Sequence, residues 1–143
     1  MTSSWKAWSV TVLLLLTISG CGGSGSKRKL VQVSGTVTFE GKPLTSGTIT
    51  FVAEGPSPVN AAGEISKSGT YTLSTERPGD GASPGTYKIR IESWASPPKM
   101  DETGVDPGKS AVPEKYNRIE TSGLTATVKE SPATQKVDFA LVP

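Results

Sequence analysis

The residue with the most distinctive chemistry in this chain is Cys21, its only cysteine. A thiolate attacks carbon and sulfur and binds metals, and a lone cysteine has no partner for an internal disulfide. Cys21 follows Ile18-Ser19-Gly20 at the end of an apolar run. Small residues at this point let the backbone enter a peptidase cleft. Cys21 is therefore the first candidate for covalent chemistry in this chain.

The residues before Cys21 have the features of a secretory signal. Lys6 supplies a positive charge, and Val10–Ile18 forms an apolar segment of about nine residues. That length is roughly half of what a helix needs to span a bilayer. The alternatives are a permanent transmembrane anchor, a buried core helix and an ordinary signal for free secretion. Length argues against the first, and Gly22-Gly23 soon after the segment argues against the second. The third leaves the lone thiol without a role.

The order Ile18-Ser19-Gly20-Cys21 resembles the lipobox of bacterial lipoproteins. This resemblance implies that residues 1–20 are a cleaved signal peptide and that Cys21 becomes an N-terminus carrying diacylglycerol and palmitate. Each buried methylene contributes about 0.8 kcal/mol, so two or three chains on Cys21 would make membrane attachment effectively permanent. Gly22, in place of an acidic residue, lacks the signal for retention in the inner membrane. The implied location is the bacterial cell envelope, at the outer membrane.

Residues 21–29 are expected to form a flexible linker between the lipid and the folded domain. Gly22-Gly23-Ser24-Gly25-Ser26 is typical of a flexible chain. Lys27-Arg28-Lys29 then either contacts anionic lipid head groups or keeps the linker solvated. Three charges and a net charge of +2 are too few to indicate a nucleic-acid partner.

The composition argues against an enzyme. Histidine is absent, which removes the most common general base, metal ligand and pH switch. No Gly-x-Ser-x-Gly elbow occurs, and no histidine is available to activate a serine. We therefore predict no catalytic residues, no cofactor and no metal. An enzyme that uses a pair of acidic residues is the remaining alternative.

Acidic residues at two places in the chain could support other chemistry. Asp101, Glu102 and Asp106 could ligate calcium through oxygen atoms, but their spacing matches no known calcium loop and favours a solvated acidic turn. Asp138 could join a lysine in an internal isopeptide bond, which needs buried partners. Because Asp138 alternates with Val137 and Phe139, it is expected to point outward.

Residues 30–143 are expected to form one all-β domain. Short runs with apolar residues at every second position are separated by many glycines and prolines, which is typical of strands joined by turns. A shorter run around Glu64–Lys67 is expected to add one more strand, and no helix longer than a turn or two is expected. Strands with one apolar face each favour two antiparallel sheets packed face to face. The predicted inward residues are Val31, Val33, Val37, Phe39, Ile49, Phe51, Tyr71, Leu73, Tyr87, Ile89, Ile91, Leu124, Ala126, Val128, Val137, Phe139 and Leu141.

Four segments resemble the carboxypeptidase regulatory-like domains of small bacterial lipoproteins. They are Val33–Leu44, with the two "glycine, then aromatic" openings Gly69–Leu73 and Pro84–Ile89, and the segment Val112–Thr125. The resemblance implies a transthyretin-like (prealbumin-like) Greek-key β-sandwich of seven strands, or six to eight. Hydrolases of that fold use histidines and a C-terminal Tyr-Arg-Gly-Ser, whereas this chain ends Ala140-Leu141-Val142-Pro143. Hydrolase activity is therefore not implied.

The last candidate surface is Trp94 together with the loop from Ser96 to Thr121. Trp94 is out of phase with Ile89 and Ile91, which predicts that it faces solvent or is covered by its own loop. So long a loop in a compact domain is usually functional or disordered. We predict a lipid-anchored envelope protein whose sandwich is a non-catalytic interaction or structural module. The alternative is binding of envelope glycans through Trp94 and residues 96–121. The partners are the membrane, through the acyl chains on Cys21, and envelope proteins or glycans, whereas the sequence gives no oligomeric state.

Overall fold

A computed structural model describes residues 29–56, 58–102 and 104–143 of the 143-residue chain. The predicted signal peptide, Cys21 and nearly all of the predicted linker lie outside the described residues. Within the described part of the chain, no helix is long and apolar enough to cross a membrane.

The first sheet of the domain is four-stranded and antiparallel, in the order β11-β6-β3-β4. Its strands are β3 (Gly47–Ala53), β4 (Ala61–Ile65), β6 (Gly85–Glu92) and β11 (Leu124–Val128). In β6 the alternation predicted from the sequence is confirmed, because Tyr87, Ile89 and Ile91 are buried. The extra strand predicted around Glu64–Lys67 is present, with its bounds shifted toward the N-terminus. That strand is β4, which ends at Ile65 before a tight turn in which the Gly69 N–H donates to the Ser66 carbonyl.

The second sheet is built around β1 (Gln32–Phe39). On one side β1 pairs antiparallel with β2 (Lys42–Pro43) and β5 (Thr70–Thr72). On the other side it pairs in parallel with β12 (Thr134–Lys136) and β13 (Phe139–Leu141). The all-β sandwich is therefore confirmed, but the domain is not antiparallel throughout, because its first and last strands run in the same direction.

The parallel pairing of β1 with the end of the chain is interrupted at one point. The register is the same on both sides, with Gln32 opposite Thr134 and Val37 opposite Phe139, so β12 and β13 are two halves of one strand. At the break, the Tyr71 hydroxyl donates to the Val137 carbonyl over 2.6 Å. A Cβ atom on Gly35 would lie 1.8 Å from the same carbonyl oxygen, so only glycine fits there.

Asp138 lies at this break, on the outer face of the sheet, and bridges the two strands there. Its Oδ1 accepts hydrogen bonds from the backbone N–H of Thr36 at 2.8 Å and from the Thr36 hydroxyl at 2.7 Å. Lys136 lies 3.2 Å from Oδ2. The Thr36 hydroxyl and N–H, with Lys136, hold the pKa of Asp138 below its usual value. The carboxylate thus replaces a backbone acceptor of the sheet, and the prediction that Asp138 points outward is confirmed.

Four aromatic side chains join the two sheets across the core. Phe51 packs edge-on against Tyr87 at 5.6 Å between ring centroids and against Phe139 at 6.1 Å. Tyr71 lies 6.3 Å from Phe51. Such pairs contribute about 0.5–1.5 kcal/mol each beyond the area they bury. Tyr71 and Tyr87 are both buried, which confirms that they fill the sandwich. Burial, and then the negative charge of Asp138, raise the pKa of Tyr71 well above its usual value.

The connection from Glu76 to Gly85 is ordered by one carboxylate. Asp80 accepts hydrogen bonds from the backbone N–H groups of Thr75 at 2.7 Å, Glu76 at 3.0 Å and Arg77 at 2.7 Å. Burial alone would raise the pKa of Asp80, but these donors outweigh it and hold the pKa below its usual value. A turn-rich stretch of sequence is therefore a fixed loop.

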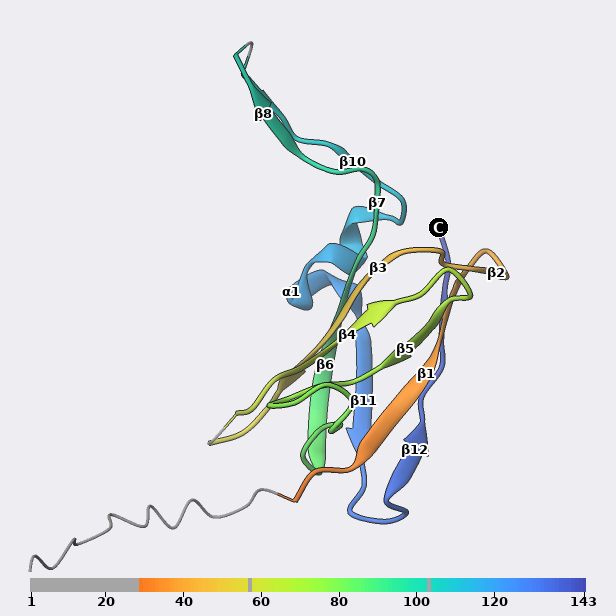
Figure 1. The fold of residues 1–143 in the computed structure, drawn as a ribbon, viewed down its shortest axis with the longest axis vertical. Coiled ribbons are helices and arrows are strands. Elements are labelled where there is room, and N and C mark those ends of the chain that lie inside the picture. Colours follow the sequence, from red (N-terminus) through yellow and green to blue (C-terminus); the bar gives the residue numbers. More distant parts are fainter. Residues whose placement is uncertain (1–28, 57, 103) are drawn as a thin grey trace, which may run out of the picture.

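The segment between β6 and β11 is an arm followed by two short helices. β7 (Trp94–Ser96) pairs with β10 (Lys109–Ser110), and β8 (Lys99–Asp101) pairs with β9 (Gly104–Asp106). The 3₁₀ helix η1 (Glu114–Asn117) and the α-helix α1 (Ile119–Ser122) follow. Figure 1 shows this arm projecting from the end of the sandwich that lies opposite the start of β1.

Gly35→Ala should lower the free energy of unfolding by at least about 3 kcal/mol, because the added methyl group overlaps the Val137 carbonyl. Urea unfolding followed by tryptophan fluorescence measures the loss. The matched control is Gly123→Ala, where nothing lies within 4 Å and only the left-handed backbone, with φ of 65°, costs about 1–2 kcal/mol. Equal stabilities of the two variants would contradict the close approach at Gly35.

Asp80→Asn should destabilise the domain at pH 7 by about 1–3 kcal/mol, because three hydrogen bonds to a charged acceptor are weakened. The folded pKa lies below the unfolded value of about 3.9. The stabilisation is therefore complete above that value and is lost as the pH falls through the folded pKa. Thermal unfolding between pH 7 and pH 2 should show a smaller loss of Tm for the variant than for the natural chain. Asp106→Asn, which removes one exposed acceptor, should change stability by less than about 0.5 kcal/mol.

Candidate functional site

The most prominent surface feature is the projecting hairpin of residues 94–110, which we call the arm. In its outer part Lys99 lies opposite Asp106, Met100 opposite Val105 and Asp101 opposite Gly104. Prolines frame this short ribbon at Pro97-Pro98 and Pro107. Proline lacks the N–H that a sheet requires, so the ribbon cannot extend the pairing of β7 with β10 without interruption.

The tip of the arm exposes apolar side chains. Met100 is 81% exposed and Val105 is 68% exposed. Since they are directly opposite in the register, both lie on the same face of the ribbon. The oppositely charged pair Lys99 and Asp106 lies on the other face. The tip is thus an amphipathic two-stranded ribbon whose apolar face is open to solvent.

The base of the arm is fixed to the sandwich through Ser93. The inward alternation of β6 continues to Ser93, which is buried, and its hydroxyl donates to the Ser46 carbonyl over 2.7 Å. The Ala111 N–H donates to the Ser93 carbonyl over 2.8 Å. Ser110 adds a hydroxyl bond to the Val112 carbonyl at 2.7 Å. The arm therefore leaves the core from a defined point.

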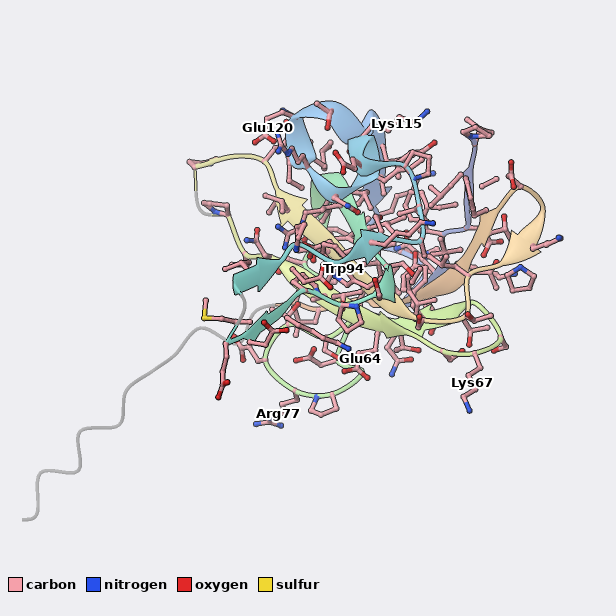
Figure 2. The ribbon with its side chains drawn as sticks, turned by 90° about the horizontal axis from the view of Figure 1, so that it is seen from above. Glu64, Lys67, Arg77, Trp94, Lys115 and Glu120 are labelled. Carbon is pink, nitrogen blue, oxygen red and sulfur yellow. The ribbon has the colours of Figure 1, made fainter. Side chains whose placement is uncertain are left out.

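Trp94 lies immediately after this fixed point and takes the outward position. Its side chain is 37% exposed, which agrees with the solvent-facing alternative and not with burial under its own loop. In the view from above in Figure 2, Trp94 lies near the middle of this end of the domain, with Lys115 and Glu120 to one side of it and Glu64 to the other. Trp94 and the start of the 96–121 segment form one continuous surface, whereas the end of that segment is folded against the sandwich.

The helical part of the 96–121 segment holds the C-terminus of the chain. Tyr116 is buried, and its hydroxyl donates to the Val142 carbonyl at 3.0 Å and accepts the Val142 N–H at 3.1 Å. Lys115 donates to the Pro143 carbonyl at 2.8 Å and lies 5.1 Å above the Tyr116 ring. Nothing in the sequence pattern predicts this contact, because it joins residues 26 and 28 positions apart through a hydroxyl and a lysine side chain. The residues of η1 therefore hold the C-terminus of the chain in place. This leaves the arm as the candidate functional surface within the 96–121 segment.

The acidic residues weighed as calcium ligands do not converge. In residues 29–56, 58–102 and 104–143, no group of three or more Asp, Glu, His or Cys side chains is placed to hold a metal ion. Asp106 instead accepts the Gly108 N–H over 2.9 Å and stabilises a turn of the arm. Asp138 is exposed beside Lys136, which is not the buried arrangement that an isopeptide bond needs.

Among the depressions on the surface of the described residues, two are well formed. One holds about 140 Å³ between Ala53, Val59 and Tyr87, and the other holds about 240 Å³ beside Lys115 and Arg118. Both are smaller than the roughly 300–1,000 Å³ of a typical ligand pocket. The arm, with its exposed apolar face, is therefore the strongest candidate for a functional surface.

No protein-family model and no curated protein matches the sequence. Among solved structures, the chain is similar to a 9R-lipoxygenase from Cyanothece PCC8801, with 12% sequence identity and a TM-score of 0.43. The similarity covers 80% of this chain and 16% of the lipoxygenase.

Tyr116→Phe should free the C-terminal residues while the core stays intact, because the hydroxyl that bridges both backbone groups of Val142 is lost. Amide hydrogen exchange at Val142 should accelerate about tenfold or more, which corresponds to about 1.4 kcal/mol. Exchange at Ile89, in the middle of β6, should change much less. If the Val142 amide of the variant exchanges at the same rate as in the natural chain, Tyr116 does not hold the C-terminus.

Proposed function

We propose that this protein is a lipid-anchored protein of the bacterial cell envelope, in which a non-catalytic β-sandwich presents the arm as an interaction surface. The observation that carries the proposal is that the chain enters the sandwich at one end and the arm leaves from the other (Figure 1). The sequence before the domain supports the anchor through the Ile18-Ser19-Gly20-Cys21 lipobox.

Hydrogen bonds at the entry point fix this polarity. The Val31 N–H donates to the Ala82 carbonyl at 2.8 Å, and the Ala82 N–H donates back at 2.9 Å. β6 begins three residues later, at Gly85, and its eight residues run to Glu92. At about 3.3 Å per residue, β6 carries the chain roughly 26 Å from the entry point before the arm begins. A lipid attached ahead of Val31 would therefore place the arm on the far side of the domain from its membrane.

The exposed residues of the arm support an interaction role. An apolar side chain as exposed as Met100 adds nothing to the stability of the sandwich. Apolar surface that remains in solvent and is bordered by charge is typical of a binding site. The sandwich contributes a rigid support, because its core and the fixed Ser93 determine where the arm begins.

Glycan binding is the second candidate function, and Trp94 is the observation that favours it. An indole that is 37% exposed can stack on a sugar ring. The same residue lies at the base of the arm, so a glycan there would contact the start of the 96–121 segment.

Labelling of growing bacteria with an alkyne fatty-acid analogue tests the anchor. The natural chain should incorporate the label and enter the detergent phase in phase partitioning, whereas Cys21→Ala should lose the label, because no thiol remains to receive lipid. Ser24→Ala, a change of similar size in the linker, should be labelled normally. Equal labelling of the Cys21→Ala and natural proteins would refute the proposed attachment.

A further inference from the structure

We infer that the partner of the arm is a second copy of this chain, joined through the free edge of β8 in a twofold, antiparallel pairing centred on Met100. The inference rests on the proposed role of the arm as an interaction surface and names what it binds. It does not depend on the lipid anchor.

The first argument is that β8 has an unpaired edge. In the described part of the arm, β8 pairs with β9 and with no other strand. The hairpin closes with Asp101 opposite Gly104, and a two-residue connection makes this closing pair hydrogen-bonded. Pairs alternate along an antiparallel ladder, so Met100 and Val105 form a non-hydrogen-bonded pair. The N–H and C=O of Met100 therefore point away from β9, toward a strand that would pair with this edge.

The second argument is that the charges of β8 are complementary to themselves. In a twofold antiparallel pairing centred on Met100, Lys99 of one copy lies opposite Asp101 of the other, and this contact occurs twice. The two Met100 residues face one another and exchange two backbone hydrogen bonds. Opposite charges placed directly across two strands stabilise the pairing, and like charges destabilise it.

The other edge of the ribbon lacks this complementarity. In a twofold pairing centred on Val105, Asp106 of one copy would face Gly104 of the other, so no charge would be matched. The β8 edge is therefore favoured. It also yields a four-stranded sheet, in the order β9-β8-β8-β9, in which Val105 and Met100 of both copies form one continuous apolar stripe.

The projection of the arm makes this geometry accessible. The arm projects away from the sandwich (Figure 1). Antiparallel β8 strands would point two such arms in opposite directions, which leaves the two sandwiches at opposite ends of the shared sheet. Prolines at positions 97 and 98 limit the pairing to a few residues. The buried area is thus below that of a standard interface, and the association is expected to be weak and dependent on concentration.

Cross-linking of single-cysteine additions tests the register. Met100→Cys and Val105→Cys are introduced into the full-length chain, which is expressed, extracted in detergent and treated with dibromobimane, a short reagent that bridges two thiols. Met100→Cys should give covalent dimers, because paired residues lie about 5.5 Å apart between Cα atoms. Val105→Cys should give at least tenfold less dimer, because three strand spacings, about 14 Å, separate the two copies.

The natural chain is the control for bridges between two Cys21 thiols, and bridges from Cys21 to the added cysteine are identified by peptide mapping of the cross-linked dimer. More dimer from Val105→Cys than from Met100→Cys would overturn the inference in favour of the β9 edge. Equal yields, or no dimer from either variant, would show that the second copy is not the partner. Fatty-acid labelling of the same samples reports separately on the proposed anchor, so failure of the inference and failure of the anchor are distinguished.

Reversal of charge tests the complementarity. In the Met100→Cys background, Asp101→Lys should reduce dimer formation about tenfold, because two pairs of lysines then face each other. Glu102→Lys makes the same change in charge beyond the end of β8 and should reduce it much less. A mixture of Asp101→Lys chains with Lys99→Asp chains should restore dimers, which would show that the arms remain folded. Failure of the mixture to restore dimers, or equal effects of the two lysine substitutions, would overturn the inference.

Discussion

The fold depends on the parallel pairing of its first strand with its last. β1 begins directly after the predicted linker, and β13 ends two residues before the C-terminus. Pairing residues about 100 positions apart has a large entropic cost, because the whole chain between them must be closed into a loop. Part of this cost is offset where Gly35 allows the Val137 carbonyl to approach. At that point the Tyr71 hydroxyl donates a hydrogen bond to the Val137 carbonyl, and Asp138 accepts one from the Thr36 N–H. A larger residue at Gly35 would separate the strands that tie the two ends of the domain together.

The same contacts connect the outer face of the sheet to the core. Asp138 holds β1 from the solvent side through Thr36, and its charge acts on the buried Tyr71 hydroxyl, which is bonded to the neighbouring Val137 carbonyl. The Tyr71 ring belongs to the aromatic group around Phe51, which joins both sheets. Backbone pairing and side-chain packing therefore reinforce each other at this point. The sandwich can support a projecting arm because this frame is closed without any contribution from the arm.

Alternation in the sequence predicted the sandwich and its inward faces, because a period of two is imposed by the geometry of a strand. It did not predict the parallel partner of β1, since the inward residues of β12 and β13 have the same pattern in either direction. The Asp80 loop was not predicted either, because its stability comes from backbone donors that carry no sequence signature. For Trp94 the sequence left two positions open, and the structure selects the outward one, since Ser93 continues the inward phase of β6. For the arm the sequence predicts only an irregular loop, because its strands are two or three residues long and prolines interrupt them.

An isolated two-stranded ribbon is marginally stable in water, and the outer part of the arm buries neither Met100 nor Val105. Its order therefore comes from the base, where Ser93 and Ser110 fix both strands, and any further gain must come from a partner. A short pairing between two arms buries little area, so it would be weak in dilute solution and would grow as the protein concentration rises.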